Sequence, residues 1–263
     1  MTPTTLATYL TLFRKAYRKQ LQYRAAHMIN NFASAIFGFV YIAIWQSATS
    51  QGGIGPYNAE TMTWYIACTQ GLLWITTFLT HGLGIPEAIR TGAVSLEMMR
   101  PVGFFGYVMS REAGHNYYNL WFRTVPLIVI FVATVGMRVP APADIPALVI
   151  AIVIGSYTGL CLAYIVGLAA FWTIEVRWAH YLNHTLVFSI GGSMIPIELL
   201  PGSLGPLGLA LPFSSLVYYP TRIYLGLARF DALVVPTVWA VLLTVLCLSM
   251  TRAARRRLEV QGG

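Results

Sequence analysis

The sequence is poor in charged residues. Asp, Glu, Lys and Arg make up only 10% of its 263 residues, whereas soluble domains carry about 25%. The chain therefore lacks the charged surface that a globular enzyme needs in water. Its hydrophobic content of 57% also excludes a disordered chain, which needs low hydrophobicity. Together with a mean hydropathy of +0.64, this composition predicts a protein that crosses a membrane several times.

Motifs for catalysis and metal binding are also missing. The three cysteines, Cys68, Cys161 and Cys247, are too widely spaced for a metal motif or a disulfide framework. The only two lysines lie near the N-terminus, and there is no GxxxxGK[ST], HExxH or GxSxG. His180 and His184 are four residues apart and could share a metal, although unligated interfacial histidines are the commoner case. We therefore expect no catalytic residue, no metal site and no cofactor bound by this chain.

Apolar segments long enough to cross a bilayer, which needs about 20 residues, recur along the chain. They predict an all-α polytopic membrane protein with a single transmembrane domain over residues 1–263. The six predicted spans are 28–49, 61–82, 117–137, 145–174, 178–197 and 232–251, with a connecting loop over 83–116 and a proline-rich segment over 199–228.

Basic residues are distributed unequally between the two sides of these spans. Of the 17 Lys and Arg residues, 13 fall before the first span, in the second and fourth connections, or after the sixth span, and Arg123 lies just inside the third span on the same side. Only Arg138, Arg222 and Arg229 fall on the other side. The positive-inside rule then predicts that both termini are cytoplasmic. The net charge of +8 is explained by this topology and by contact with anionic lipids, so no nucleic-acid partner is expected.

The N-terminal segment, residues 1–26, has the pattern of an amphipathic helix in the cytoplasmic interface. Its basic residues occupy the face that its apolar residues leave free, although a simple topogenic charge cluster is a compatible interpretation. The apolar residues recur at three- and four-residue steps, at Leu6, Leu10, Phe13, Tyr17 and Leu21.

The loop between the second and third spans contains the signals of a short helix. Pro86 followed by Glu87 is typical of a helix start, and Gly92 of a helix end. We therefore predict a helix over 86–91 that projects Glu87 and Arg90. A long loop with its own helix is often functional, but a solvated connector with a salt bridge stays open.

The segment that follows the fifth span cannot be one continuous helix. It carries no charge over 199–221 but several prolines, and each interior proline costs about 3 kcal/mol. Irregular backbone must avoid lipid, so we predict two half-helices, 204–210 and 213–227, that form a re-entrant hairpin from the outer side. Glu198, beside this segment, is the only acid close to an apolar run in the outer half. A secondary transporter normally keeps ionisable groups at mid-membrane, so the energy for any transport should arrive from outside the membrane.

Two stretches resemble a known family. IRTGAVSLEMMRPVG (Ile89–Gly103) is similar to the loop motif I-R-x-G-x-(V/L)-x-x-x-(L/M)-x-(R/K)-P, and LPFSSLVYYPTRIYLG (Leu211–Gly226) to P-F-x-x-x-x-x-x-P-x-x-x-(Y/L)-x-G. Both motifs occur in a bacterial subfamily of ABC exporter permeases of the second type. The resemblance covers essentially the whole chain and implies a multi-pass protein of the bacterial plasma membrane.

The resemblance also implies partners. Such a permease is a half-channel that pairs with a second permease, identical or homologous, and with two ABC ATPase subunits that bind the ATP and Mg. Together they would export a hydrophobic or amphipathic substrate. The alternatives are a gradient-driven secondary transporter or channel and, less favoured, a membrane-embedded enzyme or assembly factor.

The resemblance assigns roles to four sets of residues. A cytoplasmic relay would be formed by Arg123, Glu175 and Arg177, although lone helix-end charges explain them equally well. Aromatic residues on the first two spans, including Phe37, Trp74 and Phe78, could line a lipid-like or drug-like path, with core packing the commoner explanation. Coupling to the ATPase would involve Pro86, Glu87, Ala88, Ile89, Arg90, Gly92, Glu97 and Arg100, and an outer gate would involve Pro196, Glu198, Pro201, Pro206, Pro212 and Pro220.

Overall fold

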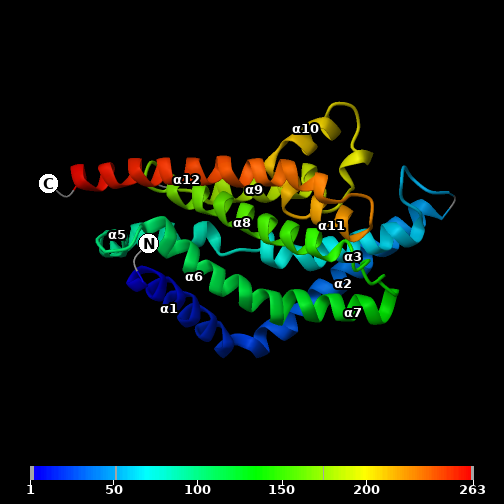
Figure 1. Ribbon diagram of the computed structural model, residues 1–263, viewed down its shortest axis with the longest axis horizontal. Helices are drawn as coiled ribbons and strands as arrows, with labels where there is room; N and C mark the ends of the chain where they lie inside the picture. The colour runs from blue at the N-terminus through cyan, green and yellow to red at the C-terminus, as the bar shows by residue number, and fades with distance from the viewer. Residues whose placement is uncertain (1–2, 51, 174, 262–263) are drawn as a thin grey trace.

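The computed structural model describes residues 3–50, 52–173 and 175–261, and the regular secondary structure in these ranges is helical. The start of α1 and the end of α12 lie at one end of an elongated bundle, the terminal end; the opposite end is the distal end (Figure 1). The α-helices are α1 (Pro3–Gln20), α2 (Arg24–Thr49), α3 (Ala59–Thr76), α4 (Ile85–Arg90), α5 (Ala93–Met98), α6 (Phe104–Asn119), α7 (Val125–Val135), α8 (Ile145–Ala169), α9 (Arg177–Ile190), α10 (Leu204–Ala210), α11 (Tyr218–Tyr224) and α12 (Val234–Gln261). The shorter turns are η1 (Leu21–Tyr23), η2 (His81–Gly84), η3 (Leu120–Thr124), η4 (Ile197–Leu199), η5 (Pro212–Ser215) and η6 (Phe230–Leu233).

Four of the described helical segments are long and apolar enough to cross a membrane. They are His27–Thr49, Phe104–Val135, Ile145–Ala169 and Phe230–Arg257. Large apolar side chains on these segments face outward, as expected for contact with lipid; Phe32 on α2 and Val153 on α8 are examples. The chain is therefore a multi-pass helical membrane protein.

The other two predicted spans contain shorter helices. In the segment 61–82 the helix α3 ends at Thr76, and in the segment 178–197 the helix α9 ends at Ile190. The predicted span over 145–174 is helical to Ala169, and Ile174 lies outside the described residues.

The third span differs from its predicted position because its helix begins earlier. Helix α6 starts at Phe104, inside the segment 83–116 that the sequence predicts as a loop, and continues through η3 into α7. The turn η3 is π-helical. Pro126 explains this irregularity, since it has no N–H to donate to the carbonyl oxygen of Phe122 four residues earlier. Asn31 of α2 donates its side-chain amide to that oxygen instead, at 2.8 Å.

Helix α3 forms the centre of the core. Thirteen of its 18 residues are buried, so it shows no amphipathic face and is surrounded by protein. Small residues let neighbours approach: a Cβ on Gly71 would lie 2.6 Å from Ile128 Cδ1 of α7. Thr124 also donates its hydroxyl to the Gly71 carbonyl oxygen at 2.8 Å, which fixes η3 against α3.

Helix α8 packs between α3 and α12. On one side a Cβ on Gly159 would overlap the backbone of Thr76, so only glycine permits this approach. Towards α12, two hydroxyl pairs join the helices, and the pairs lie seven residues apart along each helix. They are Tyr157 with Thr244 at 2.6 Å and Tyr164 with Thr251 at 2.7 Å.

The N-terminal helix α1 lies against α6 near the terminal end (Figure 1). Their backbones come close at Gly114, where a Cβ would meet the side chain of Ala16 at 3.0 Å. Phe13 and Tyr17 pack on the ring of Tyr117, with centroids 5.6 and 5.5 Å apart. The apolar face of the predicted amphipathic helix thus contacts protein, while Leu6 and Leu10 remain exposed.

Short helices fill the distal end between α9 and α12. Helix α10 has the bounds expected for the first half-helix, whereas the second is divided into η5 and α11. The division follows from Pro220, which cannot donate to the carbonyl of Leu216 and so must lie in the first turn of a new helix.

Candidate functional site

A sharp chain reversal precedes the two short helices of the terminal end. Gly82, Leu83 and Gly84 are all in the left-handed region, with φ of 52°, 53° and 73°. Glycine adopts this conformation without steric cost, and it turns the chain from the end of α3 into α4. A Cβ on Gly82 would lie 2.8 Å from the Cα of Gly167, so the reversal rests directly on the backbone of α8.

Helix α4 projects a charged pair from this support. Pro86 lies in its first turn, with Glu87 next, as the dipole of a helix favours. Arg90 donates to Glu87 at 2.6 Å, and the two side chains are 78% and 59% exposed, respectively. Ala88 and Ile89 turn the other way and pack on the core. Helix α4 thus presents a polar face at the surface over an apolar face that holds it in place.

Helix α5 continues the same surface. Gly92 separates it from α4 with a φ of 74° and lies exposed. Tyr107 donates its hydroxyl to Glu97 of α5 at 3.3 Å, and the guanidinium of Arg100 lies 5.0 Å from the ring centroid of Tyr107. Glu97 and Arg100 are therefore engaged with α6.

Arg111 of α6 joins these elements. Its guanidinium donates to the carbonyl oxygen of Leu83 and, at 2.8 Å, to Glu112. Glu97 lies 3.8 Å away. The second oxygen of Glu112 lies 3.0 Å from His115 Nδ1. This partly buried network connects the reversal, α5 and α6, so it fixes the position of α4.

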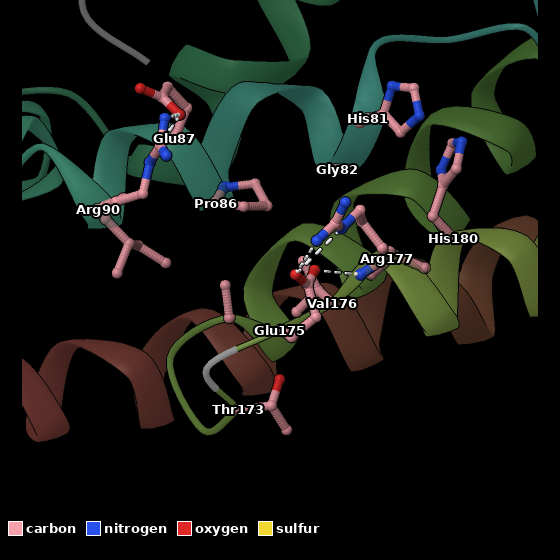
Figure 2. Close-up of a pocket in the computed structure, with 13 residues that line it drawn as sticks. His81, Gly82, Pro86, Glu87, Arg90, Thr173, Glu175, Val176, Arg177 and His180 are labelled. Atoms are coloured by element: carbon pink, nitrogen blue, oxygen red, sulfur yellow. Dashed lines mark hydrogen bonds and ion pairs between the residues drawn. The ribbon is translucent and has the colours of Figure 1, made fainter.

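A cavity of about 670 Å³ separates α4 from the α8–α9 connection (Figure 2). Pro86, Glu87 and Arg90 line one wall, and Glu175 and Arg177 line the opposite one. At the far side His81 and His180 face each other, with ring centroids 4.0 Å apart. Within the described ranges, no group of three or more His, Cys, Asp or Glu side chains could hold a metal ion.

Glu175 and Arg177 form an exposed ion pair on that wall. Arg177 donates from its guanidinium at 2.8 Å and from its backbone N–H at 2.9 Å. These hydrogen bonds lower the pKa of Glu175 from 4.5 to about 2, because they favour the charged carboxylate. The pair is thus fully ionised at neutral pH.

Arg123 does not join this pair. It lies in the π-helical turn η3, where its guanidinium carbon is 4.0 Å from the ring centroid of Trp74. It lines a separate cavity with His27 and Asn119. The expected cluster of three charges is therefore an exposed pair and one buried arginine, because η3 turns Arg123 towards α3.

At the distal end, Glu198 is paired with Arg222 at 2.7 Å. Tyr57 donates to Glu198 at 3.3 Å, and Arg222 donates to the Tyr218 hydroxyl at 3.1 Å. Burial and the neighbouring Glu198 raise the pKa of Tyr57 well above its ordinary value. The predicted gate prolines all lie at or near the starts of short helices here. Pro196 precedes η4 and Pro201 precedes α10. Pro206, Pro212 and Pro220 lie in the first turns of α10, η5 and α11, respectively.

Comparison with protein families identifies the chain. A family model described as ABC-2 family transporter protein matches residues 31–262. The chain belongs to the ABC-2 transporter family. Searches of curated proteins and of solved structures gave no match. As an ABC-2 permease it is the membrane component of a transporter, and its family associates with ABC ATPase subunits.

Several residues of this ABC-2 permease escaped the sequence analysis. Arg111 and Tyr107 were missed because the sequence predicts a loop around them, which does not indicate their helical neighbours. Arg222 was missed because its acidic partner Glu198 lies 24 residues earlier. The sequence did offer one signal that these residues have partners: charged residues within apolar helices are rare and normally paired.

Proposed function

We propose that the chain is the transmembrane permease subunit of an ATP-binding-cassette exporter. It pairs with a second permease, identical or homologous, and with two separate ATPase subunits that bind ATP and Mg. The assembly moves a hydrophobic or amphipathic substrate out across the bacterial plasma membrane. Helix α4 carries this proposal: its polar face is exposed at the terminal end, while its apolar face and the Arg111 network hold it rigidly on the bundle.

In this proposal the terminal end is cytoplasmic. Of the 17 Lys and Arg residues, 13 belong to the predicted cytoplasmic segments and Arg123 lies at the cytoplasmic end of the third span, which agrees with the positive-inside rule. With both termini cytoplasmic, α3 and α9 complete six spans with the four longer segments. Helix α4 then lies where an ATPase subunit can contact it, and serves as the coupling helix.

In this proposal, movement of the coupling helix is transmitted into the bundle across the cavity beside α4. The Glu175–Arg177 pair lies between α8 and α9, across the cavity from Glu87 and Arg90. A displacement of α4 would narrow this cavity and press on the α8–α9 connection. The Glu198–Arg222 pair would close the distal end as the outer gate.

The experiment compares two double variants of the full chain, purified from its native membranes with bound partners. Glu87→Ala with Arg90→Ala removes the exposed pair of α4. Glu60→Ala with Arg138→Ala removes an exposed acid and an exposed arginine at the distal end. Photolabelling with an azido-ATP probe then reports any ATP-binding subunit that remains bound.

We expect the wild type and the distal variant to retain a labelled subunit. The α4 variant should insert normally and lose most of that label. Equal labelling of the two variants would contradict the assignment of α4. Ion or solute flux in liposomes that contain this chain alone, driven by a gradient and indifferent to ATP, would favour a secondary transporter or channel instead.

A further inference from the structure

Arg123 is a buried charge without a charged partner. It is only 8% exposed, and Nη1 of its guanidinium has no hydrogen-bond partner among the described residues. The ring of Trp74 compensates part of the desolvation through a cation–π contact. An unpaired arginine inside a membrane protein is nevertheless costly, and such residues commonly mark a ligand pathway. The π-helical turn that places it is itself a feature often found at functional sites.

The cavity at Arg123 is small and polar. Its volume is about 240 Å³, and Gln20, His27, Asn116 and Asn119 lie in its wall. The one acid in that wall, Glu112, already accepts from Arg111 and lies against His115, so its charge is compensated. Arg123 therefore leaves an excess of positive charge directed at this space.

A larger, apolar cavity of about 520 Å³ adjoins it. The two cavities share Trp74, Phe78 and Leu79, so these residues form a common boundary. Phe37 adds a further aromatic wall. Two polar groups on this second cavity have no partner among the described residues. They are Nε2 of Gln70, a residue only 5% exposed, and Nε2 of His184.

We propose that these adjoining cavities bind an anionic amphiphile. Its carboxylate or phosphate head contacts Arg123, and its aliphatic or aromatic body lies along Trp74, Phe78 and Phe37. A guanidinium can donate two parallel hydrogen bonds to either head group. The apolar cavity buries a chain or ring system, and Gln70 and His184 supply hydrogen bonds to polar groups on that body. This assignment rests on the proposed function and names the chemical class of its substrate.

The test measures binding of radiolabelled laurate to the full chain in nanodiscs of zwitterionic phosphatidylcholine. Dodecanol, which has the same chain without the charge, is the matched competitor. Arg123→Gln should weaken laurate binding about tenfold, the loss expected when a charged hydrogen bond is removed. Arg123→Lys, which keeps the charge, should retain most of it. Trp74→Ala should weaken laurate and dodecanol alike.

Two results would overturn the proposal. One is laurate binding that Arg123→Gln leaves unchanged, and the other is equal affinity of the wild type for laurate and dodecanol. The second comparison needs no variant, so it decides the matter even where Arg123→Gln fails to fold. If the α4 variant loses the azido-ATP label but still binds laurate, the laurate site is independent of the coupling role of α4.

A further arm distinguishes the source of the anion. Replacing half of the phosphatidylcholine by phosphatidylglycerol offers the site an anionic lipid head group. A structural lipid site would then lose laurate binding in proportion to that lipid. A site for a single-chain substrate would retain it. Both results agree with an anion at Arg123.

Discussion

The guanidinium of Arg111 donates a hydrogen bond to the carbonyl oxygen of Leu83, the one non-glycine residue with positive φ in the described ranges. A side chain in the left-handed region costs about 1–2 kcal/mol, and the hydrogen bond from the half-buried Arg111 offsets this strain. The Leu83 side chain is fully buried, so the residue anchors the reversal in the core while its backbone is fixed from α6. The position of α4 thus depends on a contact from a helix 28 residues further along the chain.

Arg111→Ala should release α4 from the bundle. It removes the bond to Leu83 and leaves the buried Glu112 without its closest cation, which costs about 3 kcal/mol or more. Hydrogen exchange over residues 81–92 should become faster, with the spans at the distal end unchanged. Arg100→Ala is the matched control, because Arg100 is exposed and contacts the Tyr107 ring without bonding to Leu83. Equal protection of residues 81–92 in both variants would contradict the bracing role.

Gly159→Val should destabilise the bundle, because a side chain there overlaps the Thr76 backbone of α3. Overpacking of a close helix contact typically costs about 1–3 kcal/mol. The measurement is the thermal unfolding midpoint of the detergent-solubilised protein. Val153→Leu, on the outward face of the same helix, should leave that midpoint unchanged. An unchanged midpoint in Gly159→Val would show that α8 can move away from α3 without loss of stability.

Arg222→Ala should loosen the distal end. Glu198 then loses a charged hydrogen bond, worth about 1.5–3 kcal/mol. A cysteine introduced at the exposed Leu207 of α10 reports this through its rate of reaction with a membrane-impermeant maleimide, which we expect to rise. The double variant Glu198→Arg with Arg222→Glu restores the pair in reverse and should restore the slow rate. A rate that stays high in this swap would argue against an ion-pair lock.

Arg177→Gln should raise the pKa of Glu175 from about 2 towards its ordinary 4.5. The folded pKa is depressed, so the stabilising interaction is complete above the unfolded pKa near 4.5 and disappears as the pH falls through about 2. Carboxyl ¹³C chemical shifts of labelled glutamate, assigned with Glu175→Gln, follow this titration. An unshifted pKa in Arg177→Gln would mean that Arg177 does not hold the carboxylate.

The elements with strong local signals could be predicted from the sequence. Pro86, Glu87 and Gly92 lie at the start and end of a short helix, and α4 forms there over Ile85–Arg90. The half-helix α10 has the predicted bounds because proline and glycine punctuate the chain on both sides of it. Both cases depend on backbone constraints that act within a few residues.

What depends on distant partners could not be predicted. Arg111 and Glu112 lie in the predicted loop over 83–116, yet they neutralise each other inside a helix that begins at Phe104. Arg123 was grouped with Glu175 and Arg177 because all three lie near predicted span ends. The π-helical turn η3, which the sequence did not predict, places Arg123 against Trp74. Such pairings come from tertiary packing, which a hydropathy pattern does not contain.

The hydroxyl pairs between α8 and α12 have a mechanical consequence. Tyr157 with Thr244 and Tyr164 with Thr251 fasten the two helices at two heights, so sliding or rotation of one against the other would break both pairs at once. The two helices therefore move together as one rigid unit. Any transition between conformations has to place its hinge elsewhere in the bundle.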